Sequence, residues 1–445
     1  MNKLLQCRLA SFIIGLVLIA PKTIFARPLN STTSVLENGL KVILVEEHKA
    51  PIVVFQIWYN AGGKDEVTGK TGLSHLLEHM MFKGTANHGK GEFSRIVARK
   101  GGHENAFTGT DYTAYFEKFA SDRLELSLQL ESDRMQNLLL DPKETALETK
   151  VVQEERRTRT DDDPTSAAFE EMYAAAFKVH PYHNPVIGWM SDLDGISRDD
   201  LANHYKTWYA PNNSVIVVAG DFDSQNLLPK IREYFGKIPK GTIPAARKIV
   251  EPVQKGQRRV TVKRKAHLPF MIMGYHVPNL TSPDSYPLAI LAGILSGGKS
   301  TRLYQELVYK QQLALNAGAN YDRVSEDPNL FYVYASPQPG KDVNALEQEI
   351  YKQLDLFKTE LVSDEELQRA KNQVEAHFIF AQDSVFYQAM QIGELETIGV
   401  DHHYLEEFVE KIRLVTKEDV QRVAQKYLSE DNRTVSTLIP LADKK

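Results

Sequence analysis

The sequence predicts an α+β protein made of two related halves, each combining strands and helices. The chain has 445 residues, which is too long for one ordinary hydrophobic core and suggests two domains of roughly 200 residues each. The order strand, helix and glycine break occurs in the first half and returns after residue 265. A basic, Gly- and Pro-rich stretch over 236–265 separates the two occurrences and is typical of a linker.

The first half begins with two strand-like runs. Asn38-Gly39 is a hairpin turn signal, and the runs at 40–45 and 52–59 are rich in strand-forming residues. Helices are expected from there to about residue 209. A further buried strand at 214–219 ends at a Gly-Asp pair.

The second half repeats this order. A strand at 270–275 precedes a helix from about residue 285, a Gly297-Gly298 break and another helix from residue 300. This echoes the strand, helix and Gly84 break of the first half. We interpret the repetition as an internal duplication, with halves at 27–235 and 266–445.

The first 26 residues are predicted to be a secretory signal peptide. Lys3 and Arg8 flank an n-region, 9–20 is a short apolar core, and Ala26 ends a plausible cleavage site. The apolar run is too short to cross a bilayer comfortably, and no later segment qualifies as a membrane span. We therefore expect an exported, periplasmic protein; an uncleaved N-terminal anchor is the alternative.

Charge and cysteine content limit the kinds of partner and of metal ligand to expect. A net charge of −5 with both signs mixed gives no indication of a nucleic-acid partner. The single cysteine, Cys7, precedes the apolar core, so that cleavage would leave no thiol. Any metal ligands in the mature chain are then His and carboxylate residues.

The most informative motif is HLLEH at 75–79. A helix is predicted over 72–83 and stopped by Gly84, which places His75 and His79 on one helical face, where both rings can reach one cation. Glu78 lies on the same side of the helix. Leu and Met residues at helical intervals form the apolar face. By itself, the motif also fits a helix with two surface histidines.

The pattern H-x-x-E-H is the inverted form of a common zinc motif in which the Glu is a general base rather than a ligand. Zinc lowers the pKa of a bound water to about 7, and Glu78 would accept the proton of that zinc-bound water as it attacks a peptide carbonyl. Such a site needs a third protein ligand from elsewhere in the chain.

Candidates for that ligand lie on a helix that Asp141 and Pro142 should start as N-cap and first residue. Glu148 and Glu155 are seven residues apart and share a face. We take Glu155 as the ligand and Glu148 as a supporting carboxylate that orients a ligating imidazole. Taken alone, this segment also reads as a solvated acidic helix.

With these residues in place, the chain resembles the pitrilysin/insulinase family of zinc metallopeptidases. Within that family, the chain resembles the half-length members akin to mitochondrial processing peptidase and its bacterial periplasmic relatives. The resemblance covers nearly the whole mature chain, and Glu155 follows His79 by 76 residues, as the family's third ligand does. The matching segments are LENGL at 36–40, YNAGG at 59–63, GLSHLLEHMMFKGT at 72–85, GG at 101–102, NAFT at 105–108, HPY at 180–182 and PVIG at 185–188.

The resemblance implies a fold and a cofactor. Each half is expected to be a mainly antiparallel sheet with helices packed on one face, and the two halves to close as a clamshell. One Zn²⁺ per chain is implied, held by the half at 27–235; the half at 266–445 has no second H-x-x-E-H.

The family also implies a substrate strand. The segment 102–108 matches the sheet edge on which a peptide lies by main-chain hydrogen bonds. Asn105 and Ala106 are the implied substrate-binding residues. An ordinary edge strand is the alternative. We expect His103, His180 and His183, in the same matching regions, to be structural.

The second half of the chain departs from the family pattern at two positions. Self-sufficient members carry an Arg, and a Tyr seven residues later, that stabilise the tetrahedral intermediate. Aligning 300–315 with that pattern puts Val308 and Leu315 at the two positions. Losing an oxyanion donor typically costs about 10²- to 10³-fold in rate. Residues that could substitute are Arg302, Tyr304 and Tyr321, although their spacing does not favour them.

We therefore expect a zinc endopeptidase acting on short or unfolded peptides. It should be the catalytic subunit of a heterodimer whose homologous, zinc-less partner supplies the Arg/Tyr pair, or else a homodimer. The alternative function is a non-catalytic peptide-binding or structural subunit of a family complex.

Overall fold

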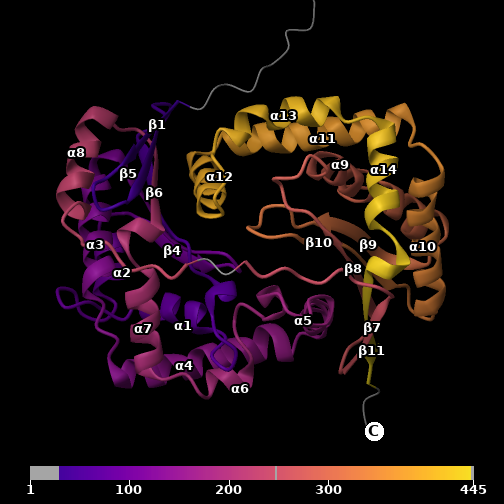
Figure 1. The fold of residues 1–445 in the computed structure, drawn as a ribbon, viewed down its shortest axis with the longest axis horizontal. Helices are drawn as coiled ribbons and strands as arrows, with labels where there is room; N and C mark the ends of the chain where they lie inside the picture. Colours follow the sequence, from indigo (N-terminus) through magenta and orange to yellow (C-terminus); the bar gives the residue numbers. More distant parts are fainter. Residues whose placement is uncertain (1–29, 246–247, 442–445) are drawn as a thin grey trace, which may run out of the picture.

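The computed structural model describes residues 30–245 and 248–441. Two β-sheets with their helices form two lobes that lie side by side (Figure 1). The expected signal peptide and Cys7 lie outside the described residues. Within these ranges, no helix has the length and apolar character needed to cross a membrane.

The first sheet has six strands in the order β1-β2-β6-β3-β5-β4, and the second has five in the order β7-β11-β8-β10-β9. The strands are β1 (Ser31–Val35), β2 (Lys41–Glu46), β3 (Ile52–Tyr59), β4 (His103–Thr108), β5 (Thr113–Ala120), β6 (Ser214–Gly220), β7 (Arg258–Arg264), β8 (Phe270–Val277), β9 (Ala314–Tyr321), β10 (Asn329–Pro337) and β11 (Arg433–Pro440).

The helices divide between the two halves in a similar way. Those of the first half are α1 (Leu73–Met80), α2 (Glu92–Arg99), α3 (Leu124–Asn137), α4 (Pro142–Arg156), α5 (Pro164–Ala176), α6 (Met190–Leu193), α7 (Arg198–Trp208) and α8 (Ser224–Phe235). Those of the second half are α9 (Ser285–Leu295), α10 (Val343–Thr359), α11 (Asp364–Gln382), α12 (Val385–Thr397), α13 (Tyr404–Leu414) and α14 (Lys417–Tyr427).

The hairpin predicted at Asn38-Gly39 joins β1 to β2 as an antiparallel pair. Gly39 has φ of 87°, a left-handed conformation that glycine adopts without steric strain. The predicted strands at 40–45, 52–59, 214–219 and 270–275 correspond to β2, β3, β6 and β8.

Strand topology supports an internal duplication. In chain order, β2 to β6 correspond to β7 to β11, and they take the same places in their sheets. In both halves one pair is parallel, β2 with β6 and β7 with β11, while the remaining pairs are antiparallel. This confirms the predicted α+β class with mainly antiparallel sheets.

The two halves also exchange a helix. α5 of the first half packs on β7, β8 and β11, and α12 of the second half packs on β3 and β6 (Figure 1). The first sheet consequently buries one face in its own half's core and the other face in the core of the second half. The family pattern of helices on one face describes each half's own helices, because the exchanged helix covers the opposite face.

Three predicted boundaries differ from the structure. The helix expected over 72–83 ends at Met80, because bonds from Phe82 N to His79 O and from Lys83 N to Met80 O tighten the chain into a turn. The helix expected from residue 300 is a short segment that becomes the π-helical turn η6 (Tyr304–Lys310). The linker expected over 236–265 includes β7, an edge strand whose charged residues conceal its strand pattern.

Candidate metal centre

Helix α1 is fixed at both its start and its apolar face. Leu73, Leu76, Leu77 and Met80 are buried, as the helical spacing predicts. Glu66 accepts hydrogen bonds of 2.7 Å from the backbone N–H groups of Gly72 and Ser74, so that it caps the helix start. Burial raises the pKa of Glu66 to about 8. Sequence reasoning missed this residue, because a cap six to eight positions away has no local signal.

The two histidines of α1 converge on one carboxylate oxygen. Glu155 Oε2 lies 3.3 Å from His79 Nε2 and 3.9 Å from His75 Nε2. Ligands bound at about 2.0–2.2 Å in a tetrahedral array lie roughly 3.3–3.6 Å apart. Within the described ranges, these three side chains form one of two His/Asp/Glu groups close enough to hold an ion.

The protonation state of His75 also suits a metal ligand. Burial, with a smaller effect from His79, lowers the pKa of His75 to about 3. The ring is therefore neutral near pH 7, with a lone pair available. Its Nε2 faces Glu155, while its Nδ1 is buried without a hydrogen-bond partner in the described structure. Two imidazoles and one carboxylate are a donor set that fits a zinc ion.

Helix α4 brings the carboxylates to this site. It begins as predicted, with Asp141 accepting hydrogen bonds from the backbone N–H groups of the next turn and Pro142 at the first position. Glu155 lies at its C-terminal end, just before the π-helical turn η3 (Arg157–Asp161). Its second oxygen, Oε1, lies 2.5 Å from the Arg159 guanidinium.

Glu148 lies where the sequence placed it, two turns before Glu155. Its Oε1 accepts a 2.9 Å hydrogen bond from His79 Nδ1, an arrangement that directs the other ring nitrogen toward Glu155. Burial alone would raise the pKa of Glu148. The hydrogen bonds from His79 and Lys83 outweigh burial and hold that pKa below its ordinary value.

Glu78 lies between α1 and the edge strand β4. Its Oε2 accepts a hydrogen bond of 2.5 Å from the Thr108 hydroxyl. Burial raises the pKa of Glu78, and the Thr108 hydrogen bond opposes that rise. Sequence reasoning missed Thr108, although it ends the NAFT segment that had been singled out.

The expected substrate residues lie on β4, the free edge of the first sheet. Side chains alternate along a strand, so Ala106 and Thr108 face α1 while Asn105 faces the opposite side. The Asn105 side-chain oxygen accepts a 2.9 Å hydrogen bond from Ala106 N. The structure therefore brings Ala106 to the His/Glu cluster, but not the side chain of Asn105.

The three histidines expected to be structural lie apart from the metal ligands. His103 stacks on Phe116 with ring centroids 6.0 Å apart. His180 is buried, and its Nε2 lies 3.1 Å from an Asp327 oxygen. His183 lines a cavity between the two halves.

The second His/Asp group comprises Asp401, His402 and His403. Both ring nitrogens of His402 are engaged, Nδ1 with Glu396 at 2.6 Å and Nε2 with Ser31 at 3.0 Å. His402 therefore has no lone pair directed at a shared centre.

Val308 and Leu315 carry no hydrogen-bond donors on their side chains. Val308 packs against the second half's core, and Leu315 at the start of β9 is 41% exposed. Arg302 is paired with Glu366 at 2.9 Å, and the Tyr321 hydroxyl donates to Pro278 O at 2.5 Å. Arg302 and Tyr321, two of the three residues that could replace the missing oxyanion donors, are therefore engaged in other contacts. The third, Tyr304, is the first residue of η6.

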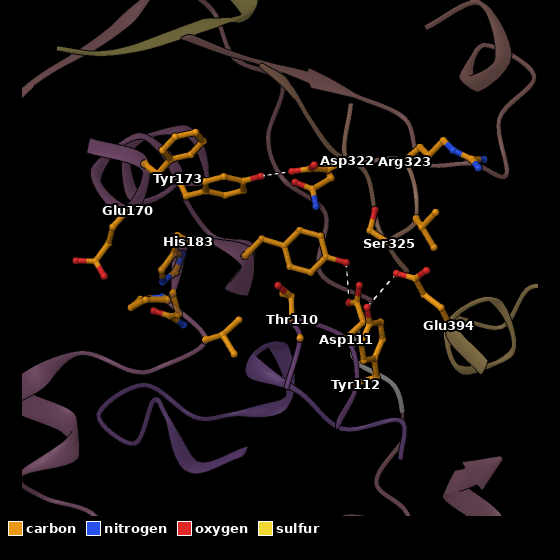
Figure 2. Close-up of a pocket in the computed structure, with 18 of the residues that line it drawn as sticks. Thr110, Asp111, Tyr112, Glu170, Tyr173, His183, Asp322, Arg323, Ser325 and Glu394 are labelled. Atoms are coloured by element: carbon orange, nitrogen blue, oxygen red, sulfur yellow. Dashed lines mark hydrogen bonds between the residues drawn. The ribbon is translucent and has the colours of Figure 1, made fainter. Parts of the chain in front are cut away.

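A cavity of about 600 Å³ lies between the halves, next to the turn that follows Thr108 (Figure 2). Tyrosine–carboxylate pairs line it, and two of them join the halves: Tyr112 with Glu394 at 2.9 Å and Tyr173 with Asp322 at 2.5 Å. In the third pair, the Tyr182 hydroxyl donates to Asp111 at 2.7 Å. This cavity is not predictable from the sequence, because its walls come from segments far apart in the chain.

Comparison with known proteins covers almost the entire chain. Residues 41–189 match the family Insulinase (Peptidase family M16), and 195–374 match Peptidase M16 inactive domain. The zinc protease PqqE of Helicobacter pylori is 33% identical over 410 residues, 91% of this chain and 92% of that protein. An uncharacterized zinc protease of Mycobacterium leprae is 28% identical over 422 residues, 94% of each chain.

Solved structures agree with this match. A protease from Helicobacter pylori has a TM-score of 0.89 and 32% identity, over 93% of this chain and 100% of that one. The first half of the periplasmic protease PqqL from Escherichia coli has a TM-score of 0.77 at 18% identity, over 94% and 93%, and so shows likeness of fold. By sequence and by structure, then, the chain belongs to the insulinase family of peptidases.

Proposed function

We propose that this chain is a zinc-dependent endopeptidase acting on short or unfolded peptides. The observation that carries the proposal is the convergence of His75, His79 and Glu155 beside the Glu78 carboxylate. When bound there, zinc would polarise the scissile carbonyl and lower the pKa of water to about 7.

Glu78 is the proposed general base. Its carboxylate accepts a proton from the attacking water as the water oxygen bonds to the carbonyl carbon. As the C–N bond breaks, Glu78 returns that proton to the amine nitrogen of the leaving peptide. Thr108 holds one oxygen of the carboxylate, which leaves the other free to move the proton. Burial raises the pKa of Glu78, which makes the carboxylate a stronger base than an exposed glutamate.

The substrate is proposed to lie on β4 as an added antiparallel strand. β4 is a free edge, and Ala106 N is bonded only locally, to the Asn105 side chain. A peptide carbonyl would replace Asn105 Oδ1 at that N–H group. Pairing of this kind recognises the backbone of the substrate and requires it to be extended, which favours short or unfolded peptides.

The site is proposed to require a second subunit. Val308 and Leu315 provide no donor for the oxyanion, and Arg302 and Tyr321 are engaged elsewhere. A homologous, zinc-less partner that supplies an Arg/Tyr pair would complete the site, and a homodimer is the other arrangement. We further propose a periplasmic location after removal of the signal peptide at 1–26. The proposed domains are 27–235 and 266–445, with β7 (Arg258–Arg264) added to the second because it pairs in the second sheet.

The first experiment measures bound zinc and cleavage of an unstructured, internally quenched peptide by the purified mature chain. Glu78→Gln is the control for contaminating proteases. We expect one zinc per chain, low activity alone, and a rise of orders of magnitude on adding the homologous partner. An equal rate with and without that partner would refute the two-subunit arrangement.

The absence of donors at Val308 and Leu315 favours one alternative, a non-catalytic peptide-binding subunit. It predicts zinc-independent peptide binding and no cleavage with any partner. Peptide hydrolysis that disappears in Glu78→Gln would exclude this alternative.

A further inference from the structure

We propose that Lys83 is a positioning residue for the metal site, acting through Glu148 on His79. The inference rests on the proposed zinc site. It adds to that site a residue just beyond the H-x-x-E-H helix, whose contact with Glu148 holds that carboxylate in the orientation His79 requires.

The geometry forms a chain of three side chains. Lys83 Nζ lies 2.5 Å from Glu148 Oε2, and Glu148 Oε1 lies 2.9 Å from His79 Nδ1. The carboxylate thus bridges a fixed cation and the imidazole, with one oxygen committed to each. A rotation of Glu148 that broke one contact would break both.

Lys83 lies in the turn that follows α1. α1 ends at Met80, and a 2.9 Å bond from Lys83 N to Met80 O folds the chain into this turn. Lys83 follows His79 by four residues, and its side chain reaches α4, where it meets Glu148.

Burial makes the second partner of Glu148 important. The Glu148 side chain is 8% exposed and that of Lys83 is 24% exposed. A buried carboxylate is stable only when its oxygens have donors or a countercharge. In the described structure, His79 and Lys83 are the partners recorded for its side chain. Without Lys83, Oε2 would have to turn toward water, and Oε1 would leave His79.

The two candidate histidine ligands differ in the hydrogen-bond partner of their Nδ1 atoms. His79 donates from Nδ1 to Glu148, which leaves the lone pair of Nε2 directed at Glu155. His75 Nδ1 has no partner in the described structure. Protein contacts therefore select the tautomer of His79 alone, and Lys83 secures the group that makes the selection.

A neighbouring ion pair provides a matched control. Lys90 Nζ lies 2.6 Å from Glu144 Oε2, one turn earlier on α4. This pair joins the same two segments of chain, but Glu144 does not contact a histidine ligand. If Lys83 only linked the loop after α1 to α4, then replacing Lys83 or Lys90 would change zinc affinity by a similar amount.

The test is a double-mutant cycle read by zinc affinity, which needs neither a partner subunit nor peptide cleavage. The variants are Lys83→Met, Glu148→Gln, the double variant, and Lys90→Met as control. Zinc affinity is measured by competition with a chromophoric chelator at constant pH. Lys83→Arg tests whether a cation of similar reach restores affinity.

We expect Lys83→Met to weaken zinc binding about 10-fold, the lower end of what loss of a ligand-orienting partner typically costs. Lys90→Met should change it less than about 2-fold, and Lys83→Arg should recover most of the loss. In the Glu148→Gln background, Lys83→Met should have no further effect, since it acts through Glu148.

An equal loss from Lys83→Met in both backgrounds would refute action through Glu148, and unchanged affinity in the single variant would refute any role at the site. Failure of the proposed function gives a different pattern. A wild-type chain that binds no zinc, or whose zinc binding survives His79→Ala, would refute the metal site and the role of Lys83 together.

Discussion

Thr108 on the sheet edge donates a hydrogen bond of 2.5 Å to Glu78 on α1, the helix that carries the candidate metal ligands. The bond joins the strand proposed to align the peptide to the carboxylate proposed to move the proton. Because Thr108 lies on β4 and its hydroxyl holds Glu78, we propose that this contact couples the alignment of the peptide to proton transfer.

Replacing Thr108 with Val should test that coupling. The isosteric side chain removes the hydroxyl, so Glu78 loses a hydrogen bond worth about 1.5–3 kcal/mol to a charged group. We expect kcat to fall about 10- to 100-fold with zinc affinity unchanged, measured on the quenched peptide with the partner present. Thr108→Ser keeps the hydroxyl and should retain most of the activity. A Val variant as active as the Ser variant would contradict the role.

The exchange of helices predicts unequal effects for two glycines in helix interiors. A Cβ at Gly393 on α12 would lie 2.1 Å from Nε1 of the buried Trp58, whereas one at Gly293 on α9 would meet its nearest neighbour at 3.6 Å. Gly393→Ala should therefore lower the free energy of unfolding by about 1–3 kcal/mol through overpacking. Gly293→Ala should raise it by up to about 1 kcal/mol. Urea denaturation of both variants checks this, and equal effects would show that α12 does not hold the halves together as described.

The cavity between the halves predicts a pH dependence of stability. Burial raises the pKa of Asp111 to about 6, so the folded protein holds this proton more tightly than the unfolded chain does. The stability that this proton contributes is complete below about pH 4 and is lost as the pH rises through about 6. The shift corresponds to about 3 kcal/mol.

Asp111→Asn mimics the protonated form at every pH. Relative to the wild type, the variant should gain up to about 3 kcal/mol in unfolding free energy between pH 4 and pH 7. Denaturation at both pH values, with Asp122→Asn on the surface as control, measures the difference. A constant offset between variant and wild type across this range would contradict the shift.

Zinc should stabilise the folded chain through one site. A ligand that binds only the native state, at a free concentration 100 times its Kd, contributes about 2.7 kcal/mol. We expect zinc to raise the melting temperature of the wild type by several degrees, and a chelator to reverse the rise. His79→Ala should abolish the effect and His403→Ala should leave it intact. Loss of the effect in His403→Ala would move the metal to the second His/Asp group.

The candidate metal site could be proposed from the sequence because its residues are close together or regularly spaced in the chain. His75, Glu78 and His79 are positioned by a single turn of helix, and Glu148 and Glu155 by two turns of another. The Asn38-Gly39 turn and the strand-like runs were predicted for the same reason, since backbone geometry is encoded within a few residues. The family resemblance supplied the spacing between the two helices, which periodicity alone could not provide.

Contacts between distant segments were not accessible in this way. Thr108 reaches Glu78, and Lys83 reaches Glu148, because the fold brings a strand edge and a turn to those positions. Asn105 is a second example of a side chain whose position only the fold decides. The family resemblance implied substrate binding by both Asn105 and Ala106, but strand alternation turns the two side chains to opposite faces.

By itself, the sequence determined the candidate metal ligands, the helical faces that they share, the duplicated order of elements and the lack of donors at Val308 and Leu315. Tertiary structure alone decided the exchange of α5 and α12, the cap that Glu66 places on α1, and the cavity around Asp111. The physical reason is the separation along the chain between the residues that determine each feature. Hydrogen-bonded periodicity repeats over two to four residues and is visible in the chain, whereas the packing of one half against the other depends on shape and burial across hundreds of residues.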